Sequence, residues 1–107
     1  MALTRSYRTT TIERSQRDPE FAQGLLDEAA TLFLNGEPEV ARILLRDLVN
    51  ATLGFEALAK ETERPSKSLH RMLSAHGNPS MDNLAAIFGA MRSWLNVEIR
   101  VTAVPAQ

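Results

Sequence analysis

The chain contains no cysteine and no long apolar run, and each absence excludes a class of protein. Without cysteine there is no disulfide framework, no thiol nucleophile and no thiolate metal site. No apolar run approaches the roughly 20 residues that a membrane-spanning helix needs. The first residues also lack the apolar stretch of a secretory signal. We therefore expect a cytoplasmic protein with no membrane partner.

Histidine is scarce as well, which bears on catalysis. The chain has two histidines, His70 and His76, and their spacing is that of neither a metal site nor an acid–base pair. The serines of the same region, Ser66, Ser68 and Ser74, have no paired base to activate them. We expect no catalytic residue, no metal, no cofactor and no small-molecule substrate, so the protein is not expected to be an enzyme.

The charge that is present is unevenly distributed. The formal net charge of the 107 residues is −1. Residues 1–17 and residues 64–81 each carry a net charge of +3, whereas residues 18–63 hold ten acids against three bases. A basic stretch in an acidic chain directs a polyanion to one face of the molecule. The alternative is that these charges only form solvated faces.

The spacing of apolar residues predicts an all-α domain of about five helices over residues 18–95. Asp18 and Ser80 are suitable N-cap residues, and Pro19 suits the first position of a helix. Asn35-Gly36, Gly54, Pro65 and Gly77-Asn78-Pro79 are expected to end or separate helices. The predicted helices are therefore 19–34, 37–53, 55–64, about 66–74 and 81–95.

Each predicted helix has an expected inner face. In the second helix we expect Val40, Ile43, Leu44 and Leu48 to face the core, with Arg42, Arg46 and Asp47 outside. The corresponding inner residues of the other helices are Phe21, Leu25, Ala29, Leu32 and Phe33 in the first, Phe55, Leu58 and Ala59 in the third, Leu69, Met72 and Leu73 in the fourth, and Met81, Leu84, Ala85, Phe88 and Met91 in the fifth.

The two ends of the chain show a different pattern. Residues 1–17 are expected to be either a flexible arm or a strand. In the C-terminal part, residues 96–107, apolar and polar residues alternate from Val97 to Ala103, which predicts a β-strand. A strand must pair, either with the N-terminal arm or with the same strand of a second copy. Trp94 is expected to close the core beside it, and the predicted dimer interface comprises Trp94, Val97, Ile99 and Val101.

Residues 55–74 combine two short helices with a tight turn, a pattern typical of a helix-turn-helix. On the second helix Lys67 and Arg71 lie opposite the apolar face. Arginine can bridge two acceptors on guanine, and lysine can reach the same edge or a phosphate. We predict that Lys67, Ser68 and Arg71 read bases while Arg64 and Asn78 contact phosphates. The full predicted DNA-binding set is Arg64, Ser66, Lys67, Ser68, His70, Arg71 and Asn78. The alternative is a helix-turn-helix retained only for its shape.

The stretch LAKETERPSKSLHRMLSAHGNPSMDNL, residues 58–84, resembles the lambda-repressor-like (Xre-type) helix-turn-helix family. More narrowly, it is similar to the small HigA-like antidote proteins of addiction modules. The match is carried by Leu58-Ala59, Ser68-Leu69, Arg71 and the run from Leu73 to Ser80, followed by Leu84, and it covers roughly residues 40–95. The resemblance implies a homodimer that binds double-stranded operator DNA. It also implies neutralisation of a RelE/ParE-like toxin encoded beside it.

The chain differs from the usual family pattern at three places. Phe55 or Glu56 stands where many members have a phosphate-contacting glutamine. Glu63 stands where the turn usually has glycine, and Pro65 where a serine often caps the second helix.

These observations predict a transcriptional repressor that acts as the antitoxin of a type II toxin–antitoxin module and binds a palindromic operator. One alternative is a protein-interaction module of the same fold that does not bind DNA, and another is a phage-type repressor without a toxin. The acidic first two helices, with Glu37 and Glu39 between them, would suit docking of a basic toxin or form an ordinary solvated face.

Overall fold

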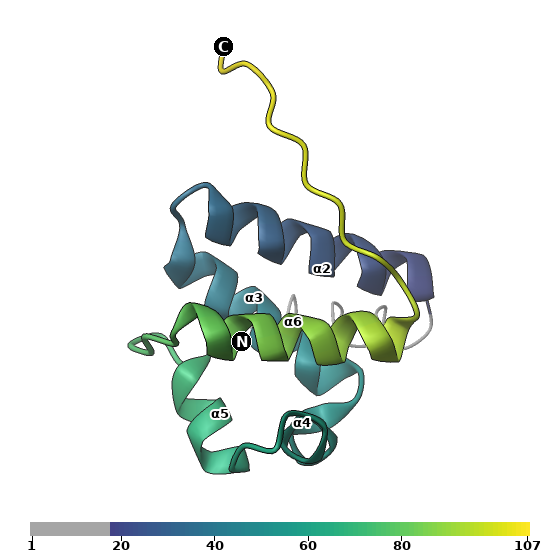
Figure 1. The fold of residues 1–107 in the computed structure, drawn as a ribbon, viewed down its shortest axis with the longest axis vertical. Helices are drawn as coiled ribbons and strands as arrows, with labels where there is room; N and C mark the ends of the chain where they lie inside the picture. The colour runs from purple at the N-terminus through teal and green to yellow at the C-terminus, as the bar shows by residue number, and fades with distance from the viewer. Residues whose placement is uncertain (1–17) are drawn as a thin grey trace, which may run out of the picture.

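The computed structural model describes residues 18–107, so the predicted N-terminal arm lies outside the described residues. The described part of the chain is all-α, with five helices, and each corresponds to a predicted one. None of these helices has both the length and the apolar character to cross a membrane. The helices are α2 (Pro19–Leu34), α3 (Pro38–Ala51), α4 (Gly54–Thr62), α5 (Ser66–Met72) and α6 (Met81–Leu95) (Figure 1).

Side-chain capping bonds set the starts of α2 and α6. The carboxylate of Asp18 accepts hydrogen bonds from the backbone N–H groups of Glu20 and Phe21, at 3.1 and 3.3 Å, and Pro19 opens α2. The hydroxyl of Ser80 accepts the N–H of Asn83 at 3.1 Å at the start of α6. Both predicted N-caps are therefore confirmed, because each side chain satisfies an N–H group that the helix leaves unpaired.

The core lies where α2, α3 and α6 meet the α4–α5 pair. The chain reverses between α2 and α3, which pack against each other, and α6 lies beside α2 and runs in the opposite direction (Figure 1). α4 and α5 form the opposite end of the molecule from the C-terminal segment. All five helices contribute fully buried side chains, which include Leu26, Leu45, Leu48, Leu58, Leu69, Leu73, Ile87 and Met91.

The inner face of α3 differs from the prediction. Val40 is 57% exposed, while Arg42 and Asp47, expected outside, are only 7% and 8% exposed. Arg42 can be buried because its guanidinium reaches two backbone carbonyls of another segment, those of Ser74 and Ala75. Hydrogen bonds of this kind compensate a buried cation for its lost water. Leu48 is buried and Leu44 packs against the core, as predicted, and the other buried apolar residues of α3 are Ala41, Leu45, Val49 and Ala51.

The ends of α6 also depart from the prediction. Met81 is 71% exposed and Trp94 is 54% exposed, so Met81 does not face the core and Trp94 does not close it. The buried residues of α6 are Ile87, Ala90 and Met91, which lie in its middle. Leu95 and the C-terminal segment pack against the core where Trp94 was expected.

The predicted C-terminal β-strand is wrong. α6 ends at Asn96, whose left-handed backbone (φ 57°) turns the chain back. The alternation of the sequence is visible in burial, since Val97 and Ile99 pack against the core while Glu98 and Arg100 are exposed. However, residues 98–103 make no backbone hydrogen bond to another residue of the range 18–107. Among residues 18–107 this extended segment has no partner strand, and a ladder requires one.

Candidate nucleic-acid interface

The turn between α4 and α5 consists of Glu63, Arg64 and Pro65. Glu63 ends α4 in the left-handed conformation, with φ 55° and ψ 42°, which is a usual conformation after a helix but one that favours glycine. Pro65 enters α5 with φ −62° and ψ 137°, and it makes no side-chain capping bond. A glutamate and a proline thus form this tight turn, and the glutamate adopts a backbone conformation suited to glycine.

Arg64 fastens the turn to α6. Its Nε donates to Oδ1 of Asn83 at 2.7 Å, and its Nη1 donates to the backbone carbonyl of Thr62 at 2.7 Å. The side chain is half-buried, and two of the five N–H donors of its guanidinium are occupied. Arg64 was predicted to contact phosphate; in the structure its side chain joins the turn before α5 to α6.

His70 lies flat on Phe55, which fixes the middle of α5 against α4. The two ring centroids are 3.9 Å apart and the rings are inclined by 20°. Phe55 is buried in the core, whereas His70 is exposed. The sequence pattern did not reveal this pair, because the stacking depends on how two separate helices come together.

Arg42 holds the far end of α5. Its Nε donates to the carbonyl oxygen of Ser74 at 3.1 Å and its Nη2 donates to that of Ala75 at 2.9 Å. These carbonyls directly follow the helix, where a cation also interacts favourably with the helix dipole. Together with the fully buried Leu69 and Leu73, these contacts fix the position of α5 at its start, its middle and its end.

The outer face of α5 carries cations that have no partner among the described residues. Lys67 and Arg71 are one helical turn apart and exposed, and neither side chain makes a hydrogen bond or ion pair with a residue of the range 18–107. Such groups remain available for charge-assisted bonds to phosphate or to guanine. Of the predicted set, Lys67, His70, Arg71 and Asn78 are exposed, and Arg64, Ser66 and Ser68 are half-buried.

Acidic residues lie on the neighbouring helix and not on α5. Glu56 and Glu61 are exposed on α4, beside the single cation of that helix, Lys60. No group of three or more His, Asp or Glu side chains in residues 18–107 is arranged to hold a metal ion. Of these two helices, α5 therefore carries exposed cations, Lys67 and Arg71, with no acidic residue among them.

Comparison with known proteins does not reveal a relative of this chain. A search against models of protein families gives no match, and searches of curated proteins and of solved structures give none.

Proposed function

We propose that the protein is a DNA-binding transcriptional repressor in which α4 and α5 form a helix-turn-helix of the lambda-repressor-like type. The observation that supports this proposal is the pair of exposed, unpartnered cations on α5, Lys67 and Arg71. A helix fixed at both ends and along one side can present these cations in a single orientation. Such preorganisation lowers the entropy lost when a side chain binds its target.

In the proposed complex α5 enters the major groove. Arg71 and Lys67 project toward base edges, with Ser68 beside them, and Arg71 can bridge O6 and N7 of a guanine. Asn78 and the remaining donors of Arg64 contact phosphates and set the register. Ser66 and His70 lie at the edge of this surface.

We further propose that a homodimer binds a palindromic operator, because a two-fold protein matches a two-fold site, with half-sites about one helical turn apart or a multiple of it. The resemblance to HigA-like antidotes supports a role as antitoxin to a RelE/ParE-like toxin. Glu37 and Glu39, both exposed at the start of α3, are the acidic residues that would meet a basic toxin. Charge reversal at both should weaken toxin binding.

One observation favours a second candidate, a protein-interaction module without DNA binding. Glu56 and Glu61 on α4 would repel a phosphate backbone, and Arg64 is partly occupied by internal bonds. In that case α4 and α5 would serve as a scaffold for a protein partner.

Binding to the DNA upstream of the protein's own gene, measured by fluorescence anisotropy over a series of salt concentrations, separates the two candidates. Arg71→Ala should weaken binding by about 5- to 150-fold, the equivalent of about 1–3 kcal/mol for a base contact. Lys67→Ala should reduce the salt slope by about 1 if it contacts a phosphate. Arg46→Ala removes the same charge from α3 and should change affinity less than about twofold. Binding that is absent, or that does not depend on salt, would contradict the DNA-binding proposal.

A further inference from the structure

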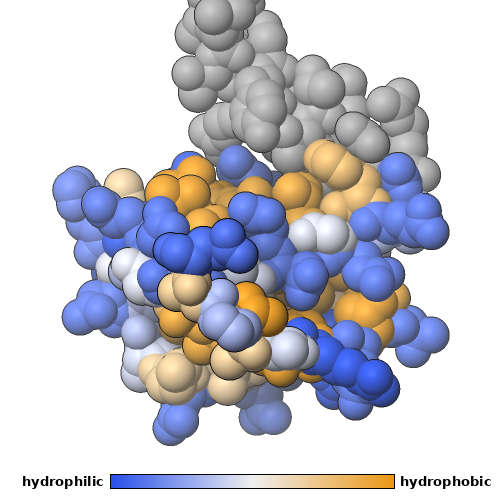
Figure 2. Space-filling view, turned by 90° about the horizontal axis from the view of Figure 1, so that it is seen from above, coloured by the Kyte–Doolittle hydropathy of each residue, from blue (hydrophilic) through white to orange (hydrophobic). Residues whose placement is uncertain are grey.

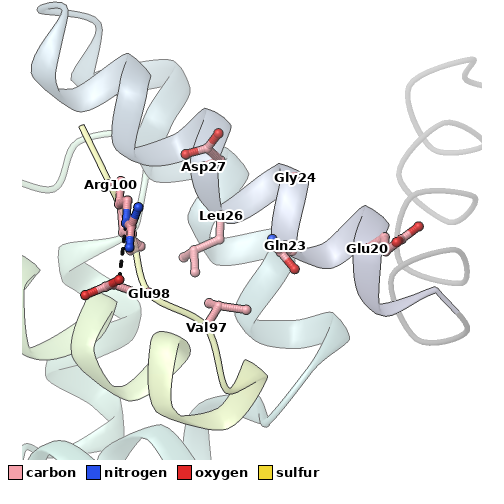
Figure 3. A pocket seen from close by; sticks show the side chains of 9 residues that line it. Glu20, Gln23, Gly24, Leu26, Asp27, Val97, Glu98 and Arg100 are labelled. Carbon is pink, nitrogen blue, oxygen red and sulfur yellow. Dashed lines mark hydrogen bonds and ion pairs between the residues drawn. The ribbon is translucent and has the colours of Figure 1, made fainter. Parts of the chain in front are cut away.

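The C-terminal segment Val97–Val101 crosses the helical body as an extended chain. Val97 faces Leu26 of α2, and the side chains of Glu98 and Arg100 lie on the outer side, joined by an ion pair of 3.3 Å (Figure 3). These two side chains are 71% and 87% exposed. Between the segment and α2 lies an open channel of about 520 Å³ whose lining includes Glu20, Gln23 and Asp27.

This segment presents an open edge. Residues 98–103 have no backbone hydrogen bond to another described residue, and all of them except Ile99 are exposed, so their N–H and C=O groups are available for pairing. Such an edge is a template for pairing with another extended chain. The sequence itself alternates here as a strand does, so pairing requires no change in which side chains face the core.

An apolar groove borders the segment. It has a volume of about 420 Å³ and lies between the end of α2, the start of α6 and the segment itself. Its rim is exposed, since Leu34 is 58%, Met81 71% and Val101 68% accessible to solvent. Figure 2, seen from the end of the molecule at which the C-terminal segment lies, shows apolar side chains reaching the surface between polar ones. Apolar surface of this kind marks a contact site.

The charges of the segment Val97–Val101 indicate which partner binds to it. Reading outward from Ile99, the residues on the two sides are Glu98 and Arg100, then Val97 and Val101. The pattern is therefore complementary to itself when the chain direction is reversed. We propose that a second copy of this protein binds here, with the two Val97–Val101 segments paired antiparallel about a two-fold axis at Ile99.

The proposed register has more favourable cross-strand pairs than a parallel pairing or an antiparallel pairing shifted by one residue. In the proposed arrangement Glu98 lies opposite Arg100 of the other copy, and Val97 lies opposite Val101, so each cross-strand pair is favourable. A parallel pairing in register would set Glu98 against Glu98 and Arg100 against Arg100. An antiparallel pairing shifted by one residue would set charged side chains against apolar ones and reverse the faces.

The inference rests on the homodimer of the proposed function, but not on DNA binding. Both tests below are made on the full chain without DNA, so failure of operator binding leaves their expected results unchanged.

Single cysteines test the register, because the natural chain has none. Opposite residues of an antiparallel pair have Cα atoms about 4.5–5.5 Å apart, within the range of a disulfide, whereas the diagonal neighbours are about 7–8 Å apart. A 1:1 mixture of Glu98→Cys and Arg100→Cys chains should therefore yield mixed disulfide dimers under mild oxidation. Intact mass spectrometry distinguishes these from the two homodimers, which should form in much lower yield. A mixed dimer that makes up no more than about half of the product, the share that random pairing gives, would overturn the register.

Charge reversal tests the same pairing without a covalent bond. Glu98→Arg and Arg100→Glu should each raise the dimer dissociation constant by about tenfold, because each places like charges opposite one another. Mixing the two variants should restore the dimer as a heterodimer, since every cross-strand pair is then of opposite charge. Sedimentation equilibrium measures both effects. A wild-type chain that remains monomeric at 100 µM, or a mixture no more associated than its components, would overturn the proposal.

Discussion

Replacing Arg42 by methionine tests whether the end of α5 depends on a buried arginine. Arg42 is 7% exposed and donates two hydrogen bonds, of 3.1 and 2.9 Å, to the carbonyls of Ser74 and Ala75. Methionine fills much of the same volume but supplies no donor. The substitution therefore removes both bonds while largely preserving the packing between α3 and the segment that follows α5.

The expected loss of stability follows from these contacts. A hydrogen bond from a charged group is worth about 1.5–3 kcal/mol, so two set an upper limit near 6 kcal/mol. Two effects reduce this figure. Ala75 is exposed and Ser74 is half-buried, so water can reach the freed carbonyls, and removing a buried charge recovers part of its desolvation cost. We expect the free energy of unfolding to fall by about 2–3 kcal/mol.

Urea unfolding followed by circular dichroism measures this loss. Arg42→Lys keeps the charge but not the planar fork of donors, and it should lose at least half as much. Arg46→Met is the matched control, because Arg46 lies one turn further along α3 and makes no hydrogen bond to a residue of the range 18–107. If Arg42→Met and Arg46→Met differ by less than about 0.5 kcal/mol, the two bonds do not stabilise the fold, and the reasoning is refuted.

Two further pairs of substitutions test local features of the fold. Gly77→Ala would place a methyl group against the last backbone carbonyls of α5, so the chain must shift, at a cost of about 1–3 kcal/mol; Gly24→Ala, with no atom within 4 Å, should instead stabilise α2 by about 0.5–1 kcal/mol. The opposite signs would appear as opposite shifts in thermal midpoint, and a neutral Gly77→Ala would argue against the close approach. Ser80→Ala removes the acceptor of the Asn83 N–H and should cost about 1 kcal/mol in chemical unfolding, whereas Ser93→Ala, inside the same helix, should cost almost nothing.

The number and limits of the helices could be predicted because their signals are local. Asp18 and Ser80 cap helices through bonds to residues two or three positions away, and Pro65 restricts the backbone beside it. The buried face of α5, with Leu69 and Leu73, also follows directly from helical spacing. None of these depends on how the helices pack together.

The predictions that failed depend on tertiary partners. Polarity placed Arg42 outside, but carbonyls 32 and 33 residues away allow it to be buried. Alternation from Val97 to Ala103 indicates which side chains face the core, yet it is the same for a paired strand and for an unpaired extended segment. The stacking of His70 on Phe55 likewise arises only when α4 and α5 meet. The exposed cations of α5 were predicted, whereas the contacts that orient this helix were not.

The stack of Phe55 and His70 also gives the protein an internal magnetic probe. An imidazole 3.9 Å above a benzene ring experiences its ring current, so the His70 proton resonances should lie upfield of their usual positions while α5 is docked. The chain has one other histidine, the exposed His76, which serves as a reference in the same spectrum. The chemical shifts of His70 during titration with DNA or a protein partner would thus report directly whether α5 stays packed against α4 when the protein binds.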